Sequence, residues 1–84
     1  MSFAVRIDPH ADKFLTKLPK DMAERIRDKL LLLKEDPFNY LEHFEGDYYK
    51  LRIGDYRALI DVDSSRKIVF VRHIDHRSRI YKRF

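Results

Sequence analysis

The sequence predicts a small α+β domain in which two N-terminal helices pack on one face of a twisted antiparallel sheet, in the order β-α-α-β-β-β. Two observations support this prediction. Apolar residues recur at the helical period in the first half of the chain, whereas from about residue 47 they alternate, as they do in strands. Gly54-Asp55 then separates two alternating segments by only two residues, which is typical of a hairpin. Such an order favours one layer of helices on one layer of sheet.

The first half is predicted to contain a strand and two helices. Residues 3–8 (FAVRID) alternate and are expected to form the strand. Asp8 followed by Pro9 is a typical helix start, because the carboxylate caps free backbone N–H groups and proline fits the first turn. This short helix is expected to end before Pro19. A second helix is expected over about residues 20–35, with a buried stripe at Met22, Ile26, Leu30 and Leu33.

Leu31 and Leu32 lie off the buried stripe of the second helix. Leucines beside an apolar face either form a surface on which another protein packs or are buried under the following loop. The sequence leaves both interpretations open. Under the first interpretation, both residues are candidates for binding a partner.

The second half is predicted to form three consecutive antiparallel strands. They are residues 48–53 (YYKLRI), 56–62 (YRALIDV) and 67–74 (KIVFVRHI), with a turn at residues 63–66. Glycine in the first position of the two-residue turn favours type II′. The polar residues 75–84 are expected to leave the sheet as a short turn of helix.

The two-residue turn fixes the register of the hairpin, and this register brings like charges together on one face. It places Arg52 directly opposite Arg57, with Lys50 two residues away on the same face. Like charges facing one another across a strand pair are destabilising. Either an anion or a nearby carboxylate is therefore expected among them, and Asp61 and Asp63 on the same face are the carboxylate alternative. The planar guanidinium fork suits phosphate, so we predict that this face binds the RNA backbone.

Charge is distributed unevenly along the chain. Residues 1–49 carry 8 Lys/Arg against 10 Asp/Glu, and residues 50–84 carry 10 against 4. The basic charge is therefore concentrated where a polyanion would be attracted, although solubilising surface charge is the alternative. The length of 84 residues predicts one domain (1–84). The sequence lacks cysteine and any apolar run typical of a signal peptide or a membrane span, so a cytoplasmic protein is expected.

The C-terminal segment and the first hairpin strand add candidate RNA-binding residues. Tyr48 offers a stacking surface for an unpaired base. The basic and aromatic residues of the C-terminal segment are His76, Arg77, Arg79, Tyr81, Lys82 and Arg83. The other histidines are His10, His43 and His73, and His73 and His76 lack the spacing of a zinc pair. No metal site and no cofactor are therefore expected.

The element order, the segment YKLRIGDYRALIDVD and the ending HRSRIY resemble the RelE/ParE superfamily of toxins from type II toxin–antitoxin modules, over essentially the whole chain. LRIGDYR and the HR…Y ending look most like the RelE branch. The resemblance implies a RelE-like microbial ribonuclease fold and a toxin that cuts messenger RNA in the ribosomal A site. It also implies that cleavage needs no metal, because the RNA 2′-hydroxyl attacks the adjacent phosphate. A RelB-like antitoxin would bind and block the toxin, and no membrane is implied.

The resemblance assigns roles to individual residues. Arg57 would bind phosphate and stabilise the transition state, Arg77 would be a phosphate ligand or an acid, and Tyr81 would stack on or orient the RNA. Lys50 and Arg52 match basic positions on the preceding strand. The best-known bacterial members have a lysine where this chain has Tyr48, which leaves the general base unassigned. It also keeps open the ParE alternative, in which the same fold inhibits DNA gyrase without cutting RNA.

Overall fold

The structure, a computed structural model, describes residues 2–80. Its elements are β1 (Ala4–Ile7), α1 (Pro9–Thr16), α2 (Lys20–Leu31), the 3₁₀ turns η1 (Leu32–Lys34) and η2 (Pro37–Asn39), β2 (Glu42–His43), β3 (Tyr48–Ile53), β4 (Tyr56–Asp63) and β5 (Ile68–His76). The predicted α+β class and its two helices are confirmed, and the structure adds the short strand β2. No helix of the described residues is long and apolar enough to cross a membrane.

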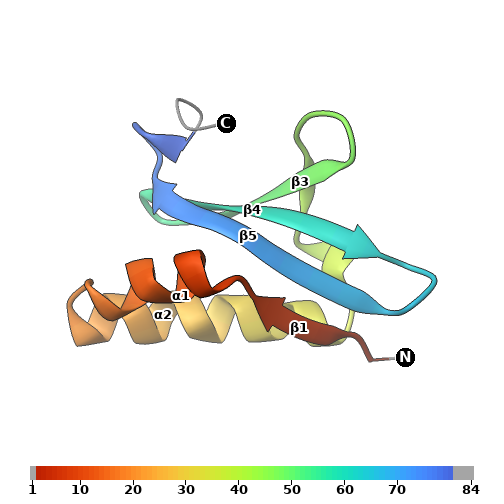
Figure 1. The fold of residues 1–84 in the computed structure, drawn as a ribbon, viewed down its shortest axis with the longest axis horizontal. Coiled ribbons are helices and arrows are strands. Elements are labelled where there is room, and N and C mark those ends of the chain that lie inside the picture. Colours follow the sequence, from red (N-terminus) through yellow and green to blue (C-terminus); the bar gives the residue numbers. More distant parts are fainter. Residues whose placement is uncertain (1, 81–84) are drawn as a thin grey trace.

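The strands form one sheet in the order β1-β5-β4-β3-β2 (Figure 1). β3, β4 and β5 form the predicted antiparallel arrangement. β1, however, pairs with β5 in parallel, from Ala4 opposite Ile68 to Ile7 opposite Val71. The sheet is therefore mixed, which refines the expected antiparallel arrangement at this edge. Parallel pairing is possible because β1 and β5 are joined by a long connection rather than by a hairpin.

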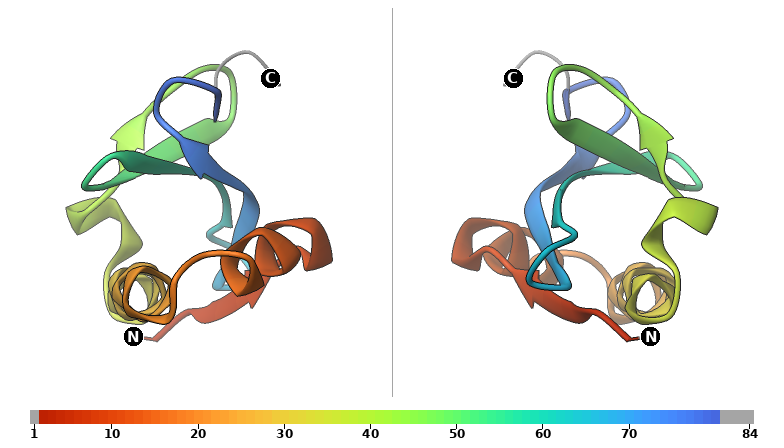
Figure 2. Two further views of the ribbon diagram at one scale, coloured as in Figure 1. Left: turned by 90° about the vertical axis from the view of Figure 1, so that its left-hand side faces the viewer. Right: turned by 90° about the vertical axis from the view of Figure 1, so that its right-hand side faces the viewer.

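Both helices lie on one side of the sheet (Figures 1 and 2). Asp8 caps α1 as predicted, since its Oδ1 accepts a hydrogen bond from the backbone N of His10 at 2.9 Å. α2 ends at Leu31 and continues as the 3₁₀ turn η1, earlier than expected. The core between helices and sheet contains the buried side chains of Ala11, Leu15, Ile26, Leu30, Leu33, Leu51, Ile53, Ala58, Ile60, Val69, Val71 and Ile74.

The hairpin of β3 and β4 has the predicted register. Arg52 lies opposite Arg57, and Lys50 lies opposite Leu59. Gly54, the first residue of the turn, has a φ of 58°. This left-handed conformation costs residues with a side chain roughly 1–2 kcal/mol, which explains why glycine stands there.

β5 continues through His76, which corrects the prediction that residues after 74 leave the sheet. Asp75 lies on β5 opposite Arg57 and is only 3% exposed. Opposite charges at facing positions stabilise a strand pair, so these polar residues stay in the sheet. The following residues, 77–80, turn to the side of the sheet away from the helices (Figure 1).

Asp63 stabilises the turn between β4 and β5. Its Oδ1 accepts hydrogen bonds from Ser65 Oγ at 2.8 Å and from the backbone N of Arg66 at 3.1 Å. These hydrogen bonds, that of Ser65 above all, favour the charged carboxylate and lower the pKa of Asp63 below its ordinary value. The carboxylate of Asp63 is therefore engaged in hydrogen bonds within the β4–β5 turn.

Candidate functional site

One end of the sheet, at the β3–β4 turn, collects arginines from three parts of the chain. Arg52 and Arg57 flank the turn on β3 and β4. Arg77 lies beside the same turn, because its backbone N donates to the carbonyl of Asp55 at 2.8 Å and its Nε is 3.8 Å from Asp55 Oδ1. We call Arg52, Arg57 and Arg77 the cationic end. The fold thus unites these three of the predicted catalytic residues.

Arg57 is the buried member of the cationic end. It is only 8% exposed, and its Nη1 donates hydrogen bonds to the carbonyls of Gly54 and Tyr56, both at 2.7 Å. Asp75 faces it from β5. A buried guanidinium needs hydrogen bonds, and the two carbonyls supply them; Asp75 places an opposite charge on the neighbouring strand, although no ion pair of residues 2–80 joins it to Arg57. The third strand therefore explains how two arginines can face each other across the hairpin.

Arg52 and Lys50 have different surroundings on β3. Lys50 is 28% exposed at its side chain, and its Nζ lies 3.8 Å from Oε2 of Glu42 on β2. Arg52 is exposed, and within residues 2–80 no carboxylate lies within 4.0 Å of its guanidinium. Arg52 is therefore the residue on this hairpin best placed to bind an anion from solvent.

The sheet face away from the helices is less cationic than the sequence predicted. Asp61 pairs with Arg72 of β5, with 3.4 Å between Oδ2 and Nη2. Leu59, on the same face as Arg57, is fully buried. Positive charge is therefore confined mainly to the cationic end. Neither Asp61 nor Asp63, the carboxylates considered from the sequence, is the cross-strand neighbour of Arg57; that neighbour is Asp75.

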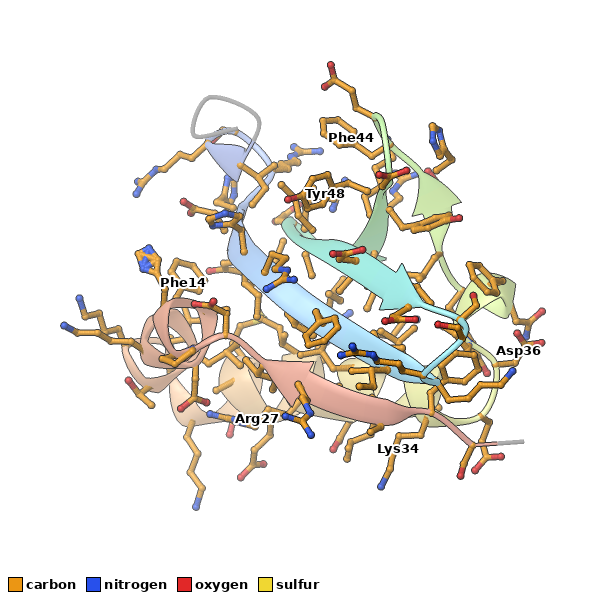
Figure 3. The ribbon with its side chains drawn as sticks, turned by 45° about the vertical axis from the view of Figure 1, so that its right-hand side comes forward. Phe14, Arg27, Lys34, Asp36, Phe44 and Tyr48 are labelled. Atoms are coloured by element: carbon orange, nitrogen blue, oxygen red, sulfur yellow. The ribbon has the colours of Figure 1, made fainter. Side chains whose placement is uncertain are left out.

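Tyr48 lies away from the cationic end. It stands opposite Asp61 and four residues before Arg52, which along a strand is roughly 13 Å. Figure 3 shows Tyr48 on the side of the sheet away from the helices, near Phe44. The structure therefore separates Tyr48 from the arginines with which the sequence grouped it, and a base stacked on it would lie at some distance from them.

His76 and Arg79 lie at and after the end of β5. Nδ1 of His76 accepts a hydrogen bond from the backbone N of Ser78 at 3.2 Å, and its ring makes an edge-to-face contact with Tyr56 at 5.7 Å. Because Nδ1 is an acceptor, Nε2 carries the proton of the neutral ring. Arg79 is exposed. Three further predicted residues, Tyr81, Lys82 and Arg83, lie outside the described residues.

α2 contributes a cation to this region that the sequence analysis missed. Nη2 of Arg25 lies 3.9 Å from the position that a Cβ would occupy on Gly54, so its guanidinium reaches the β3–β4 turn. Helical periodicity identifies Arg25 only as a residue outside the buried stripe. Its approach to the turn depends on how α2 packs against the hairpin, for which the sequence has no local signal.

The donors gathered at the cationic end are guanidinium groups, which bind phosphate through charge and directed hydrogen bonds. Within residues 2–80 no three histidine or carboxylate side chains converge as ligands of a metal ion. The arrangement is suited to bind a phosphodiester and to stabilise negative charge that develops on it.

A separate apolar surface lies at the end of α2. Leu31 and Leu32 are 53% and 42% exposed, and Phe38 and Tyr40 are 47% and 38% exposed. We call these four residues the apolar ridge. The loop does not bury the two leucines, so the structure decides between the two interpretations that the sequence left open. Exposed large apolar residues in neighbouring segments are typical of a protein–protein interface.

The element order, together with arginines gathered at one end of the sheet, is what the resemblance to toxins of the RelE/ParE superfamily implied. The chain belongs to the ParE toxin family, since its residues 5–81 match the family described as "ParE toxin of type II toxin-antitoxin system, parDE". It is therefore a toxin of a type II toxin–antitoxin module, as the sequence resemblance implied.

Solved structures of RelE toxins have a similar fold. The RelBE2 complex of Mycobacterium tuberculosis matches with a TM-score of 0.83 at 22% identity, over 90% of this chain and 99% of that one. The RelE–RelB complex of Pyrococcus horikoshii matches with a TM-score of 0.78 at 26% identity, over 94% of this chain and 99% of that one. A mutant of Escherichia coli RelE in the free state matches with a TM-score of 0.74 at 29% identity, over 98% of this chain and 93% of that one. No curated protein sequence matches the chain.

Proposed function

We propose that this toxin is a ribosome-dependent endoribonuclease that cuts messenger RNA in the ribosomal A site and so inhibits translation. The observation that carries the proposal is the cationic end, where Arg52, Arg57 and Arg77 surround one turn. Three guanidiniums around one turn suit a phosphodiester whose negative charge increases during cleavage. Similarity to RelE toxins, at 26–29% identity over nearly the whole chain, supports the same activity.

The proposed reaction is an internal transesterification. The 2′-hydroxyl of the RNA loses its proton to a base and attacks the adjacent phosphorus. A new bond forms between O2′ and phosphorus, and the bond from phosphorus to O5′ breaks as O5′ takes up a proton. The products are a 2′,3′-cyclic phosphate and a 5′-hydroxyl. No oxidant, reductant or metal enters this balance, so the side chains have to supply only charge and proton transfer.

The structure suggests different roles for the residues of this site. Arg52 and Arg77, both exposed, would hold the non-bridging oxygens of the phosphate. Arg57, fixed by two carbonyls, would position the turn and stabilise the developing charge. Lys50 and Tyr81 remain candidates for proton transfer and for orienting the RNA. The proposed RNA-binding residues are Tyr48, His76, Arg79, Lys82 and Arg83.

Mapping RNA ends on programmed ribosomes tests this proposal. The wild-type chain should cut the message within the A-site codon and leave a 2′,3′-cyclic phosphate, and Arg52→Ala should reduce the rate by roughly 10²–10³. Arg66→Ala is the matched control, because it removes an exposed arginine from the β4–β5 turn. A wild-type chain that leaves ribosome-bound message intact would refute the nuclease proposal.

A second candidate function is inhibition of DNA gyrase without cleavage of RNA. The specific observation in its favour is the family match itself, whose description names ParE. In that case the toxin would be a protein-binding inhibitor rather than an enzyme. Purified gyrase with plasmid DNA distinguishes the two, because a gyrase inhibitor would cause DNA breaks while messenger RNA stays intact.

We also propose that a RelB-like antitoxin restrains this toxin in the cytoplasm. The similar structures from Mycobacterium tuberculosis and Pyrococcus horikoshii are both toxin–antitoxin complexes. The apolar ridge offers a surface for an amphipathic helix, with Leu31 and Leu32 as its most exposed leucines. An acidic segment of the same partner could cross the cationic end and block it. Complex formation should then weaken as salt rises, because part of the attraction is between exposed charges.

A further inference from the structure

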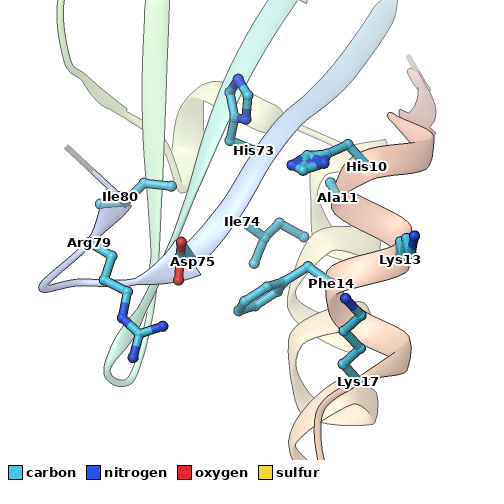
Figure 4. Close-up of a pocket in the computed structure, with 10 residues that line it drawn as sticks. All are labelled: His10, Ala11, Lys13, Phe14, Lys17, His73, Ile74, Asp75, Arg79 and Ile80. Carbon is cyan, nitrogen blue, oxygen red and sulfur yellow. The ribbon is translucent and has the colours of Figure 1, made fainter. Parts of the chain in front are cut away.

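A pocket of about 270 Å³ lies between α1 and β5, outside the cationic end (Figure 4). β1 pairs with β5 only as far as Val71, so the rest of β5 has an edge that β1 does not cover. α1 forms one wall of the pocket, and β5 with the turn after it forms the other. The pocket is therefore built by the fold and is not an irregularity of a loop.

The floor of the pocket is apolar and partly aromatic. Ala11, Ile74 and Ile80 are each at most 5% exposed. Phe14 projects from α1 into the same space (Figure 4). The rings of His10 and His73 meet edge to face at the mouth, 6.2 Å between centroids. Such a floor suits a flat, apolar group that can stack against rings.

The rim of the pocket is cationic. Lys13 of α1 and Lys17, the C-cap of this helix, lie four residues apart, and Arg79 projects from the opposite wall (Figure 4). Like charges at this helical spacing repel each other, and no ion pair of residues 2–80 includes any of the three. Asp12, on the same helix, is paired with Arg27 of α2 at 2.9 Å and does not line the pocket. The rim is thus suited to an anion.

Asp75 connects the pocket to the cationic end. It lines the pocket and faces Arg57 across the pair of strands β4 and β5. Neighbouring strands are roughly 5 Å apart, so the pocket and Arg57 are separated by about one strand. An RNA strand bound at the cationic end would therefore pass close to the mouth of the pocket.

We propose that this pocket binds one nucleotide of the RNA that flanks the cleaved phosphate, with the base against Phe14 and the phosphate between Lys13, Lys17 and Arg79. The inference rests on the proposed nuclease function and adds a substrate subsite to it. A segment of acidic residues alone would satisfy the cations but not the apolar floor with its rings. Those features therefore favour a nucleotide.

Binding of adenosine 5′-monophosphate, followed by amide chemical shifts of the full chain, tests the proposal. The nucleotide should shift the amides of Ala11 and Ile74, and Lys13→Ala/Lys17→Ala should weaken its binding at least tenfold. Lys20→Ala/Lys29→Ala is the matched control, because it removes the same charge from exposed positions of α2 and should leave binding unchanged. Thermal unfolding of both double variants checks that the fold is intact.

Three outcomes would overturn the proposal. The first is the absence of shifts at these amides. The second is equal binding of inorganic phosphate, which would show that the base makes no contact. The third is tighter binding of a poly-glutamate peptide than of the nucleotide, which would assign the pocket to a protein partner. Nucleotide binding by a chain that cuts no message would count against the proposed nuclease function instead, so the two failures are distinguishable.

Discussion

Arg57 and Arg52 face each other across one hairpin, yet removing them should have opposite effects on stability. Arg57→Ala removes two hydrogen bonds from a charged donor to the carbonyls of Gly54 and Tyr56, each worth roughly 1.5–3 kcal/mol. It also leaves the buried Asp75 without the cation across the strand pair. The two hydrogen bonds together set the expected loss in the free energy of unfolding at about 3–6 kcal/mol.

This loss is large for a chain of 84 residues. At roughly 0.05–0.15 kcal/mol per residue, the whole domain is stabilised by about 4–13 kcal/mol. Arg52→Ala should change stability by at most about 0.5 kcal/mol, because the side chain is exposed. It also relieves the repulsion of two facing arginines, so a small gain is the expected sign.

Urea unfolding followed by circular dichroism measures both variants, with the slope against urea checking that the transition remains two-state. Arg57→Lys is a useful intermediate, since it keeps the charge facing Asp75 but loses the fork of donors, and about half of the loss is expected. The reasoning would be refuted if Arg57→Ala lowered the free energy of unfolding by less than about 1 kcal/mol, or if Arg52→Ala were equally destabilising.

Four further predictions have simple tests. Gly54→Ala should destabilise the chain by roughly 1–2 kcal/mol in urea unfolding, because φ is 58° there; an unchanged midpoint would contradict the turn geometry. Leu31→Ser/Leu32→Ser should weaken antitoxin binding in calorimetry without changing thermal stability, whereas equal affinity would exclude the apolar ridge as the interface. Messenger cleavage should persist in a chelator when ribosomes remain intact, and loss of cleavage restored by a divalent ion would overturn the mechanism. Asp63→Asn should be less stable than wild type at neutral pH, and the difference should decrease as pH falls through the lowered pKa of Asp63; a difference that does not decrease as the pH is lowered would refute this.

The sequence predicted those features that depend on neighbours in the chain. Asp8 and Pro9 fixed the start of α1, and the two-residue turn at Gly54 fixed the hairpin register with Arg52 opposite Arg57. Helical periodicity also placed Leu31 off the buried stripe of α2, where the structure has it 53% exposed. Each of these features is determined within one element or one tight turn.

The features that the sequence missed depend on contacts between distant segments. The parallel pairing of β1 with β5 and the approach of Arg25 to Gly54 have no local signal. Asp75 was assigned to a tail because it is polar, whereas its place in β5 follows from the arginine that faces it. Arg57 was placed on an exposed cationic face of the hairpin. Its burial depends on β5, which the hairpin register does not include.

The pairing of β1 with β5 has a consequence for when the toxin can become active. β1 is synthesised first, but its partner strand is the last one of the sheet, so the sheet is incomplete in a nascent chain until β5 has left the ribosome. Contacts between such distant segments form slowly compared with local ones. Asp75, which faces Arg57, and Arg77, which docks on the turn, also come from this final part of the chain. Under the proposed function, the ribosome that makes this toxin would therefore be protected from it during synthesis, and an antitoxin already present would bind the apolar ridge as the last strand folds.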